Sequence, residues 1–168
     1  MKKLLFTLLF MLAGIPAAFA QTGEAKAFAQ KIADDIMAQV VEIKAPLSVK
    51  EKNFHTLFTQ AADLKKIARF TLGRFAKTAS EQELQAFTDA FTDNVVDTWT
   101  QRFSSYAGEK IVFADARQEN GKDVYVRSEL LMTDGASKIE IVWRVSMKKG
   151  KTTLVDLVVE GVSMILSY

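Results

Sequence analysis

The spacing of apolar residues changes near Lys110, and this change constrains the fold more than any other feature of the chain. Before it, apolar residues recur every three or four positions, which is the period of an amphipathic helix. After it they alternate, which is the period of a half-buried strand. Helices in one half and strands in the other indicate an α+β fold. We therefore predict amphipathic helices packed on one face of a four-stranded, twisted antiparallel sheet.

The first half contains the patterns of four helices. Two of them begin with Ser-x-x-Glu capping boxes, at Ser48 and Ser80, and Asp63 is a candidate cap for another. A helix that includes Gly73 should bend or end there, because glycine is a weak helix former. The predicted helices cover residues 24–43, a short stretch from 48, a stretch from 63 to about 73, and residues 80 to about 106.

The last of these helices carries a bulky apolar stripe. Seven residues at steps of three or four should face inward: Leu84, Phe87, Phe91, Val95, Trp99, Phe103 and Tyr106. On another face, Asp89, Asp93 and Asp97 form either a solvated acidic ridge or a docking surface for a basic partner. The apolar stripe fills a core or lines a cavity, and its spacing does not distinguish the two.

The second half has the pattern of an antiparallel meander. Strands are predicted at residues 111–117, 124–132, 139–147 and 154–166, separated by the turn dipeptides Asn120-Gly121, Asp134-Gly135 and Lys149-Gly150. Trp143 lies on the apolar face of the third strand, which should pack against the helices. Gly161 inside the last strand indicates a bulge or a close backbone approach. Asp156 and Glu160 share a face of that strand, as part of a polar outer surface or as partners of Arg69 or Arg74.

Residues 1–20 have the pattern of a cleaved export signal. Lys2 and Lys3 precede an apolar run, and Ala18-Phe19-Ala20 supplies small residues before a cleavage point. The run has roughly ten residues, whereas a membrane span needs about 20. Without the two lysines, 20 basic residues remain against 20 acidic ones, which does not favour nucleic acid as a partner. We expect residues 21–168 to form a single exported domain.

The residue types argue against several kinds of chemistry. The chain has no Cys, so disulfides, thiol catalysis and thiolate metal sites are excluded. Its one His, His55, is expected at a surface or half-buried position of a short helix, where a zinc site would lack a second His. Neither a Gly-x-Ser-x-Gly elbow nor a phosphate-binding glycine-rich loop occurs. We predict no catalytic residue, no metal and no cofactor, and hence a protein that is not an enzyme.

Four segments in a fixed order carry a family resemblance: Asp63-Leu-Lys-Lys-Ile-Ala-Arg-Phe-Thr-Leu-Gly-Arg-Phe75, Gln82-x-x-x-x-Phe87-x-x-x-Phe91, Tyr106-Ala107-Gly108-Glu109 and Asp156-x-x-x-Glu160-Gly161-Val162-Ser163. Together they resemble the MlaC family, also called the toluene-tolerance family, of periplasmic phospholipid-binding proteins. The run from Arg102 to Glu109 and the ending Glu160 to Met164 are most similar to its hopanoid-associated branch.

The resemblance implies a soluble lipid carrier. Such a protein binds the acyl chains of a phospholipid, or a hopanoid-like lipid, in an apolar pocket between helices and sheet. It shuttles lipid between an outer-membrane lipoprotein complex and an inner-membrane ABC transporter, and so maintains outer-membrane lipid asymmetry. Two departures stand out: family members usually carry Trp near the position of Phe75, and they usually continue past the last strand into a terminal helical segment, whereas this chain stops at Tyr168.

Periodicity and resemblance together indicate a set of lipid-binding residues: Leu72, Phe75, Phe87, Phe91, Val95, Trp99, Phe103, Val126, Ile141, Trp143 and Val159. Two other classes of function stay open at this point. One is a small pocket enzyme on a nuclear-transport-factor-like α+β scaffold, which would need an Asp–His pair. The other is a periplasmic adaptor that uses the acidic ridge for contact.

Overall fold

The computed structural model describes residues 17–106, 108–119, 123–148, 150–165 and 167, with side chains from residue 20 onward. Most of the predicted export signal therefore lies outside the described residues. Ala18, Phe19 and Ala20 lie at the start of the first helix, and cleavage after them stays a prediction. No helix in the described part of the chain is long and apolar enough to cross a bilayer.

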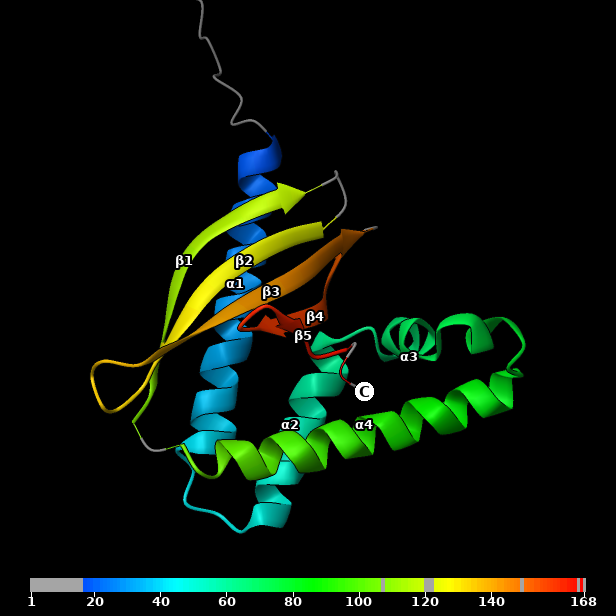
Figure 1. Cartoon of the computed structure of the whole chain (residues 1–168), viewed down its shortest axis with the longest axis horizontal. Coiled ribbons are helices and arrows are strands. Elements are labelled where there is room, and N and C mark those ends of the chain that lie inside the picture. The colour runs from blue at the N-terminus through cyan, green and yellow to red at the C-terminus, as the bar shows by residue number, and fades with distance from the viewer. Residues whose placement is uncertain (1–16, 107, 120–122, 149, 166, 168) are drawn as a thin grey trace, which may run out of the picture.

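The first half is helical, as predicted, with some changes at the boundaries (Figure 1). The first helix begins earlier than residue 24, and its last turn is wound as a π-helix. Gly73 ends α3 with a positive φ of 54°, as its position in the sequence indicated. The elements are α1 (Ala17–Ile36), the π-helix η1 (Met37–Val41), α2 (Leu47–Ala61), α3 (Leu64–Leu72), the 3-10 helix η2 (Gly73–Lys77) and α4 (Glu81–Phe103).

The two Ser-x-x-Glu motifs behave differently in the structure. At the start of α4 the capping box is complete: the Glu83 N–H donates to the Ser80 Oγ over 3.2 Å, and the Ser80 N–H donates to the Glu83 Oε2 over 2.8 Å. At the start of α2 the predicted box is wrong, because Pro46 takes the N-cap position and Ser48 lies inside the first turn. Proline fixes φ near the value that a helix start tolerates, so it can begin α2 without a side-chain cap.

Replacing Ser80 with alanine should lower the free energy of unfolding by about 1 kcal/mol, because α4 loses a partner for its first N–H groups. Ser48→Ala is the matched control and should change stability by less than about 0.5 kcal/mol. Urea denaturation followed by circular dichroism measures both. Equal losses in the two variants would contradict the assignment of the caps.

The Ser80 variant also carries an expected pH dependence. The Ser80 backbone N–H and then its hydroxyl lower the pKa of Glu83 below its ordinary value of 4.5. A lowered pKa in the folded state means that the stabilisation is full above 4.5 and is lost as the pH falls through the lower value. Ser80→Ala keeps the backbone N–H and removes only the hydroxyl, so only the hydroxyl part of this pH dependence is lost. The difference in stability between wild type and Ser80→Ala should therefore shrink slightly in acid.

The second half forms an open antiparallel sheet of five strands, so the predicted number of four is wrong. The strands are β1 (Lys110–Glu119), β2 (Asp123–Leu131), β3 (Lys138–Lys148), β4 (Lys151–Val159) and β5 (Val162–Ser163), in spatial order β1 to β5. The predicted last strand is interrupted because Glu160 and Gly161 both have positive φ, 49° and 81°. Two such residues make a tight hairpin turn, which pairs Val162 with Val159.

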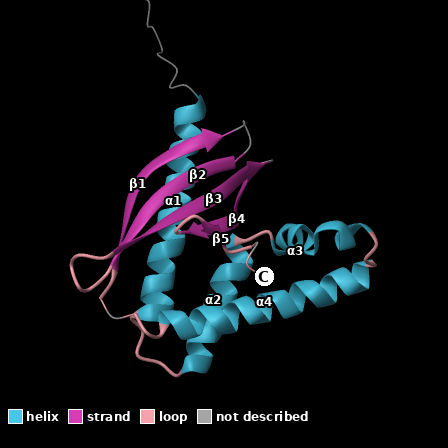
Figure 2. Ribbon diagram, in the orientation of Figure 1, coloured by secondary structure: helices cyan, strands magenta, loops and turns pink. Residues whose placement is uncertain are grey.

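Helix α1 provides most of the contact between helices and sheet. Ala25, Ala29 and Ala33 are fully buried at one face of α1, because small side chains let a helix approach the strands closely. They pack with Val124, Val126, Trp143, Val145 and Leu154 of the sheet. Figure 2 shows α1 running behind the strands, with α2, α3 and α4 beside the sheet.

The other helices bury a second cluster among themselves. Its buried members are Val40, Phe54, Ala62, Ile67, Phe91, Val95, Val96 and Ile165. They come from η1, α2 and the residue after it, α3, α4 and the segment after β5. The protein thus has one apolar cluster between α1 and the sheet and another among the helices.

Candidate functional site

A cavity of about 270 Å³ lies where the two apolar clusters meet. Helices, strands and the segment after β5 all contribute to its wall. The lining residues are Ile32, Ala33, Ile36, Met37, Phe54, Leu57, Phe58, Ala61, Ile67, Phe91, Val95, Trp99, Arg102, Phe103, Tyr106, Ile111, Leu130, Ile139, Ile141, Trp143, Leu154, Asp156, Leu157, Val159, Met164 and Ile165. Arg102 and Asp156 are the charged residues in this lining, and nearly all the others are apolar.

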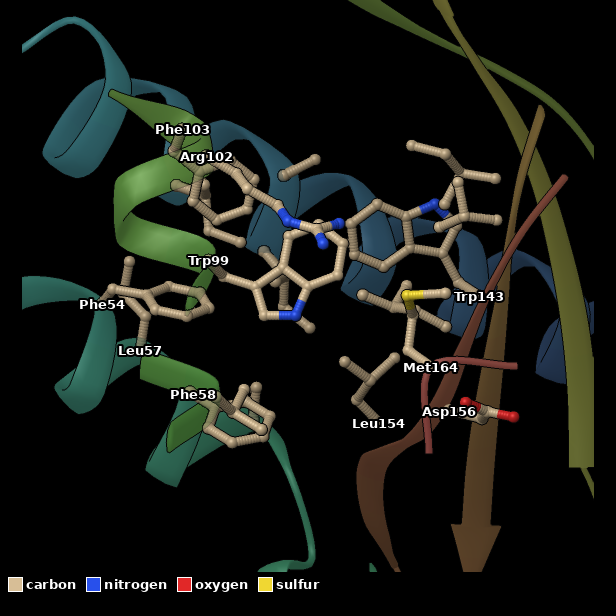
Figure 3. A pocket seen from close by; sticks show the side chains of 18 of the residues that line it. Phe54, Leu57, Phe58, Trp99, Arg102, Phe103, Trp143, Leu154, Asp156 and Met164 are labelled. Atoms are coloured by element: carbon tan, nitrogen blue, oxygen red, sulfur yellow. The ribbon is translucent and has the colours of Figure 1, made fainter. Parts of the chain in front are cut away.

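Aromatic rings form one continuous wall of the cavity. Phe103 is at its centre, with ring centroids 5.4 Å from Phe54, 5.7 Å from Trp99 and 5.9 Å from Tyr106. Figure 3 shows the rings of α2 and α4 on one side of the cavity and Trp143, from the sheet, on the other. Aromatic pairs at such distances contribute about 0.5–1.5 kcal/mol each beyond the area that they bury, so these contacts stabilise the wall.

Trp143 belongs to both the cavity wall and the core. Its side chain is 3% exposed, and its Nε1–H donates to the Ser128 Oγ over 2.8 Å, which satisfies the one polar atom of the indole. Phe113 packs beside it, with ring centroids 5.8 Å apart. The buried hydrogen bond fixes the orientation of the ring that the cavity contacts.

The structure brings seven of the sequence-predicted residues together at this cavity: Phe91, Val95, Trp99, Phe103, Ile141, Trp143 and Val159. It places four elsewhere. Val126 is fully buried in the cluster between α1 and the sheet, and does not reach the cavity. Leu72, Phe75 and Phe87 surround a separate depression between η2 and the first turns of α4.

Phe87 and Phe75 lie outside the cavity for two different physical reasons. Helix α4 has 23 residues and is longer than the cavity, so its apolar stripe continues past the cavity at Phe87. Beyond α3, the turn at Gly73 directs the chain into η2, where Phe75 is 60% exposed. The Arg74 guanidinium lies 5.0 Å above the Phe75 ring.

Sequence reasoning missed the contributions of α1 and α2. Ile32 and Ile36 from α1, and Phe54, Leu57 and Phe58 from α2, line the cavity. Their helical spacing was visible in the sequence, but the same spacing describes residues of a solid core. The structure also places Arg102 in the lining, and a pattern of apolar residues alone could not indicate this charged residue.

The interpretation of Asp156 as an outer-surface residue, or as a partner of Arg69 or Arg74, is wrong. Asp156 lines the cavity, and its carboxylate accepts hydrogen bonds from the Ser163 hydroxyl at 2.7 Å and the Ile165 N–H at 3.4 Å. It therefore fastens the segment after the last hairpin to β4. Arg69 instead donates to Glu81 over 2.9 Å.

The titratable groups near the cavity do not form an acid–base pair. Partial burial, followed by the negative charge of Glu109, raises the pKa of Tyr106, while Arg102 opposes the shift. The Tyr106 phenol is therefore protonated at neutral pH. His55 is exposed on α2 and is absent from the lining. In the part of the chain that the structure describes, no three His, Cys, Asp or Glu side chains gather where they could hold a metal ion.

Comparison with known proteins identifies the family. The family model for MlaC protein matches residues 26–168. In fold, the chain is similar to the phospholipid-binding protein from Ralstonia solanacearum, whose structure was solved in complex with a phospholipid. The TM-score is 0.76 with 19% sequence identity, over 86% of this chain and 82% of that one. Because the family model spans most of its length, this chain belongs to the MlaC family.

Proposed function

We propose that this protein is a periplasmic carrier that binds the acyl chains of a lipid in the cavity between its helices and its sheet. The observation that supports this most is the lining itself: a cavity of about 270 Å³ whose wall is aromatic and aliphatic, with two charged residues. A largely apolar concavity with a few polar groups is the usual form of a ligand site. Membership of the MlaC family and the lipid-bound structural relative point to the same ligand class.

The energetic need for such a carrier is large. Burial of a methylene is worth about 0.8 kcal/mol, so two ordinary acyl chains represent on the order of 20 kcal/mol of unfavourable exposure to water. Unassisted passage through an aqueous compartment is slow for that reason. A carrier that encloses the tails lowers this barrier, and it can release the lipid only to an acceptor that binds at least as well.

The seven predicted residues that meet at the cavity are the proposed tail-binding set, together with the α1 and α2 residues on the same wall. In this proposal the cargo is a phospholipid or a hopanoid-like lipid. The carrier exchanges it with an inner-membrane ABC transporter and an outer-membrane lipoprotein complex. The predicted signal at residues 1–20 supports export to the periplasm.

To test this function, the full-length chain is expressed in a bacterium that exports it to the periplasm. The purified protein is then analysed by native mass spectrometry. The expected result is about one lipid per protein, which organic extraction then identifies by its head group. Protein that stays free of lipid in that compartment, while circular dichroism shows a folded α+β domain, would overturn the proposal.

No observation favours a pocket enzyme on the same scaffold. Such a site would need an acid and a base within hydrogen-bond reach of a substrate. The lining contains no histidine, and the carboxylate of its one acidic residue, Asp156, accepts hydrogen bonds from Ser163 and Ile165. The acidic ridge of Asp89, Asp93 and Asp97 is exposed on α4, which leaves it accessible as a contact for a basic partner.

A further inference from the structure

We propose that the end of the molecule formed by α3 and η2 binds the surface of an anionic membrane. We call residues 64–79 the α3–η2 tip. Its exposed phenylalanines, Phe70 and Phe75, enter the outer part of the bilayer, and its basic side chains pair with anionic head groups. The inference goes beyond the proposed function, because it concerns adhesion to a membrane surface and not the binding of a lipid in the cavity.

The two most exposed large apolar side chains in the described part of the chain belong to this tip. Phe75 is 60% exposed and Phe70 is 56% exposed, on either side of the turn at Gly73. Phe75 also borders the depression beside Leu72, so part of its ring has a structural role. Phe70 lines neither the depression nor the cavity. Scattered exposed aliphatic residues are normal, but exposed aromatic residues that gather at one end indicate a contact outside the chain.

The tip also carries a local excess of positive charge. Residues 64–79 contain five basic side chains and no acidic one, whereas the whole chain has 22 basic and 20 acidic residues. Lys65 and Arg69 both pair with Glu81. Within the residues that the structure describes, no carboxylate forms an ion pair with the other three, which are all exposed: Lys66, Arg74 and Lys77. Three unpaired cations therefore accompany the two exposed rings.

The acidic groups near the tip do not cancel this charge. Asp63 accepts the Lys66 N–H over 3.2 Å, and Glu83 is held in the capping box of α4. Over residues 63–83, five basic side chains still exceed three acidic ones. The acidic ridge begins at Asp89, which lies about 12 Å along the helix axis from Glu81. Charges are screened over about 8 Å at physiological ionic strength, so the ridge acts only weakly on the tip.

The position of the tip suits contact with a flat surface. Figure 1 shows α3 and the first turns of α4 at one end of the molecule, away from β1 and β2. An end that projects in this way can touch a bilayer without obstruction by the sheet. Phe70, Arg74 and Phe75 are also absent from the cavity lining, so adhesion and tail binding use separate residues.

A membrane fits the tip better than a second copy of the chain or an acidic protein does. Two copies would bring their unpaired cations together and repel each other. A stable protein interface takes about 20–30 residues from each partner, far more than the exposed rings and cations of the tip supply. A bilayer needs no matching shape, because aromatic rings enter at the head-group level while Lys and Arg are attracted to anionic lipids.

Vesicle flotation tests this assignment. The exported chain, with its processing verified by mass, is mixed with vesicles of phosphatidylcholine alone or of phosphatidylcholine and phosphatidylglycerol in equal amounts. Wild type should float with the anionic vesicles and at least about fivefold less with the neutral ones, which is the effect of one cation near an anionic surface. Salt at about 1 M should weaken the binding, because it shortens the screening length to about 3 Å.

Single substitutions assign the binding to the tip. Phe70→Ser should lower the partition onto anionic vesicles by about fivefold, and Phe70→Ser combined with Phe75→Ser by more than about tenfold. Val112→Ser is the matched apolar control, because Val112 is 50% exposed on β1. Lys66→Gln should also lower the partition by about fivefold. Lys52→Gln, at an exposed position of α2, is its control. Both controls should float as wild type does.

A wild type that does not float with anionic vesicles, or a Phe70→Ser variant that floats as well as wild type, would overturn the proposal. Binding to native membranes but not to pure lipid vesicles would indicate a protein partner, and would overturn it too. The carrier function fails separately, because native mass spectrometry counts the lipid in the cavity. Trp99→Glu should lose that lipid and still float, whereas Phe70→Ser should keep the lipid and float poorly.

Discussion

Trp99→Glu should lose most of its bound lipid, by more than tenfold relative to wild type in native mass spectra. Trp99 is half-buried and faces the cavity from α4. A carboxylate at this position must either keep water in the cavity or become protonated, because an isolated buried charge costs several kcal/mol. In both cases the cavity no longer offers a dry apolar wall to a lipid tail. Glutamate is a good helix former, so α4 itself should persist.

A second variant on the opposite helix separates a cavity effect from a local one. Leu57→Glu introduces the same charge from α2, and it should lose lipid to a similar degree because Leu57 lines the same cavity. Gln101→Glu on α4 and His55→Glu on α2 are the controls, because both positions are exposed and outside the lining. Lipid retained by the Trp99 and Leu57 variants, with folding verified by circular dichroism, would contradict the assignment of the cavity as the binding site.

The fold was largely predictable because the two hydrophobic periods are physical consequences of helix and strand geometry. The error in strand number came from Glu160 and Gly161. They lie between apolar valines, so the pattern of a strand continues through them in the sequence. Glycine inside a strand pattern indicates a bulge in many sequences, and only the pair of positive φ angles shows a hairpin turn. The wrong capping box at the start of α2 has a similar origin, because Ser48-x-x-Glu51 and Ser80-x-x-Glu83 are the same motif in sequence, and only one of them caps a helix.

The site was predictable only in part, because periodicity reports which face of a helix is buried and not what it is buried against. Phe87 and Phe91 are neighbours on one stripe, with ring centroids 6.1 Å apart, yet only Phe91 lines the cavity. Ile32 and Phe54 follow the same helical pattern as residues of a solid core. The position of the void depends on how α1, α2, α4 and the sheet diverge, which is a property of the tertiary packing.

The two tryptophans should have very different effects on stability, and this difference tests whether the cavity exists in solution. Trp143 is buried, hydrogen-bonded to Ser128 and packed beside Phe113, so Trp143→Ala should cost about 3–5 kcal/mol. Trp99 already faces open space on one side, so its removal mainly enlarges a void and should cost about 1–2 kcal/mol.

Urea unfolding followed by far-ultraviolet circular dichroism measures both losses without relying on tryptophan fluorescence. Delipidated protein is required, because a ligand that binds only the folded state adds stability in proportion to its affinity. If Trp99→Ala costs as much as Trp143→Ala, then the Trp99 ring is packed on all sides, and there is no room for a tail beside it. A much smaller loss of stability in Trp99→Ala than in Trp143→Ala would mean that the aromatic wall of α4 faces unfilled space. Such space is the physical condition for carrying a lipid.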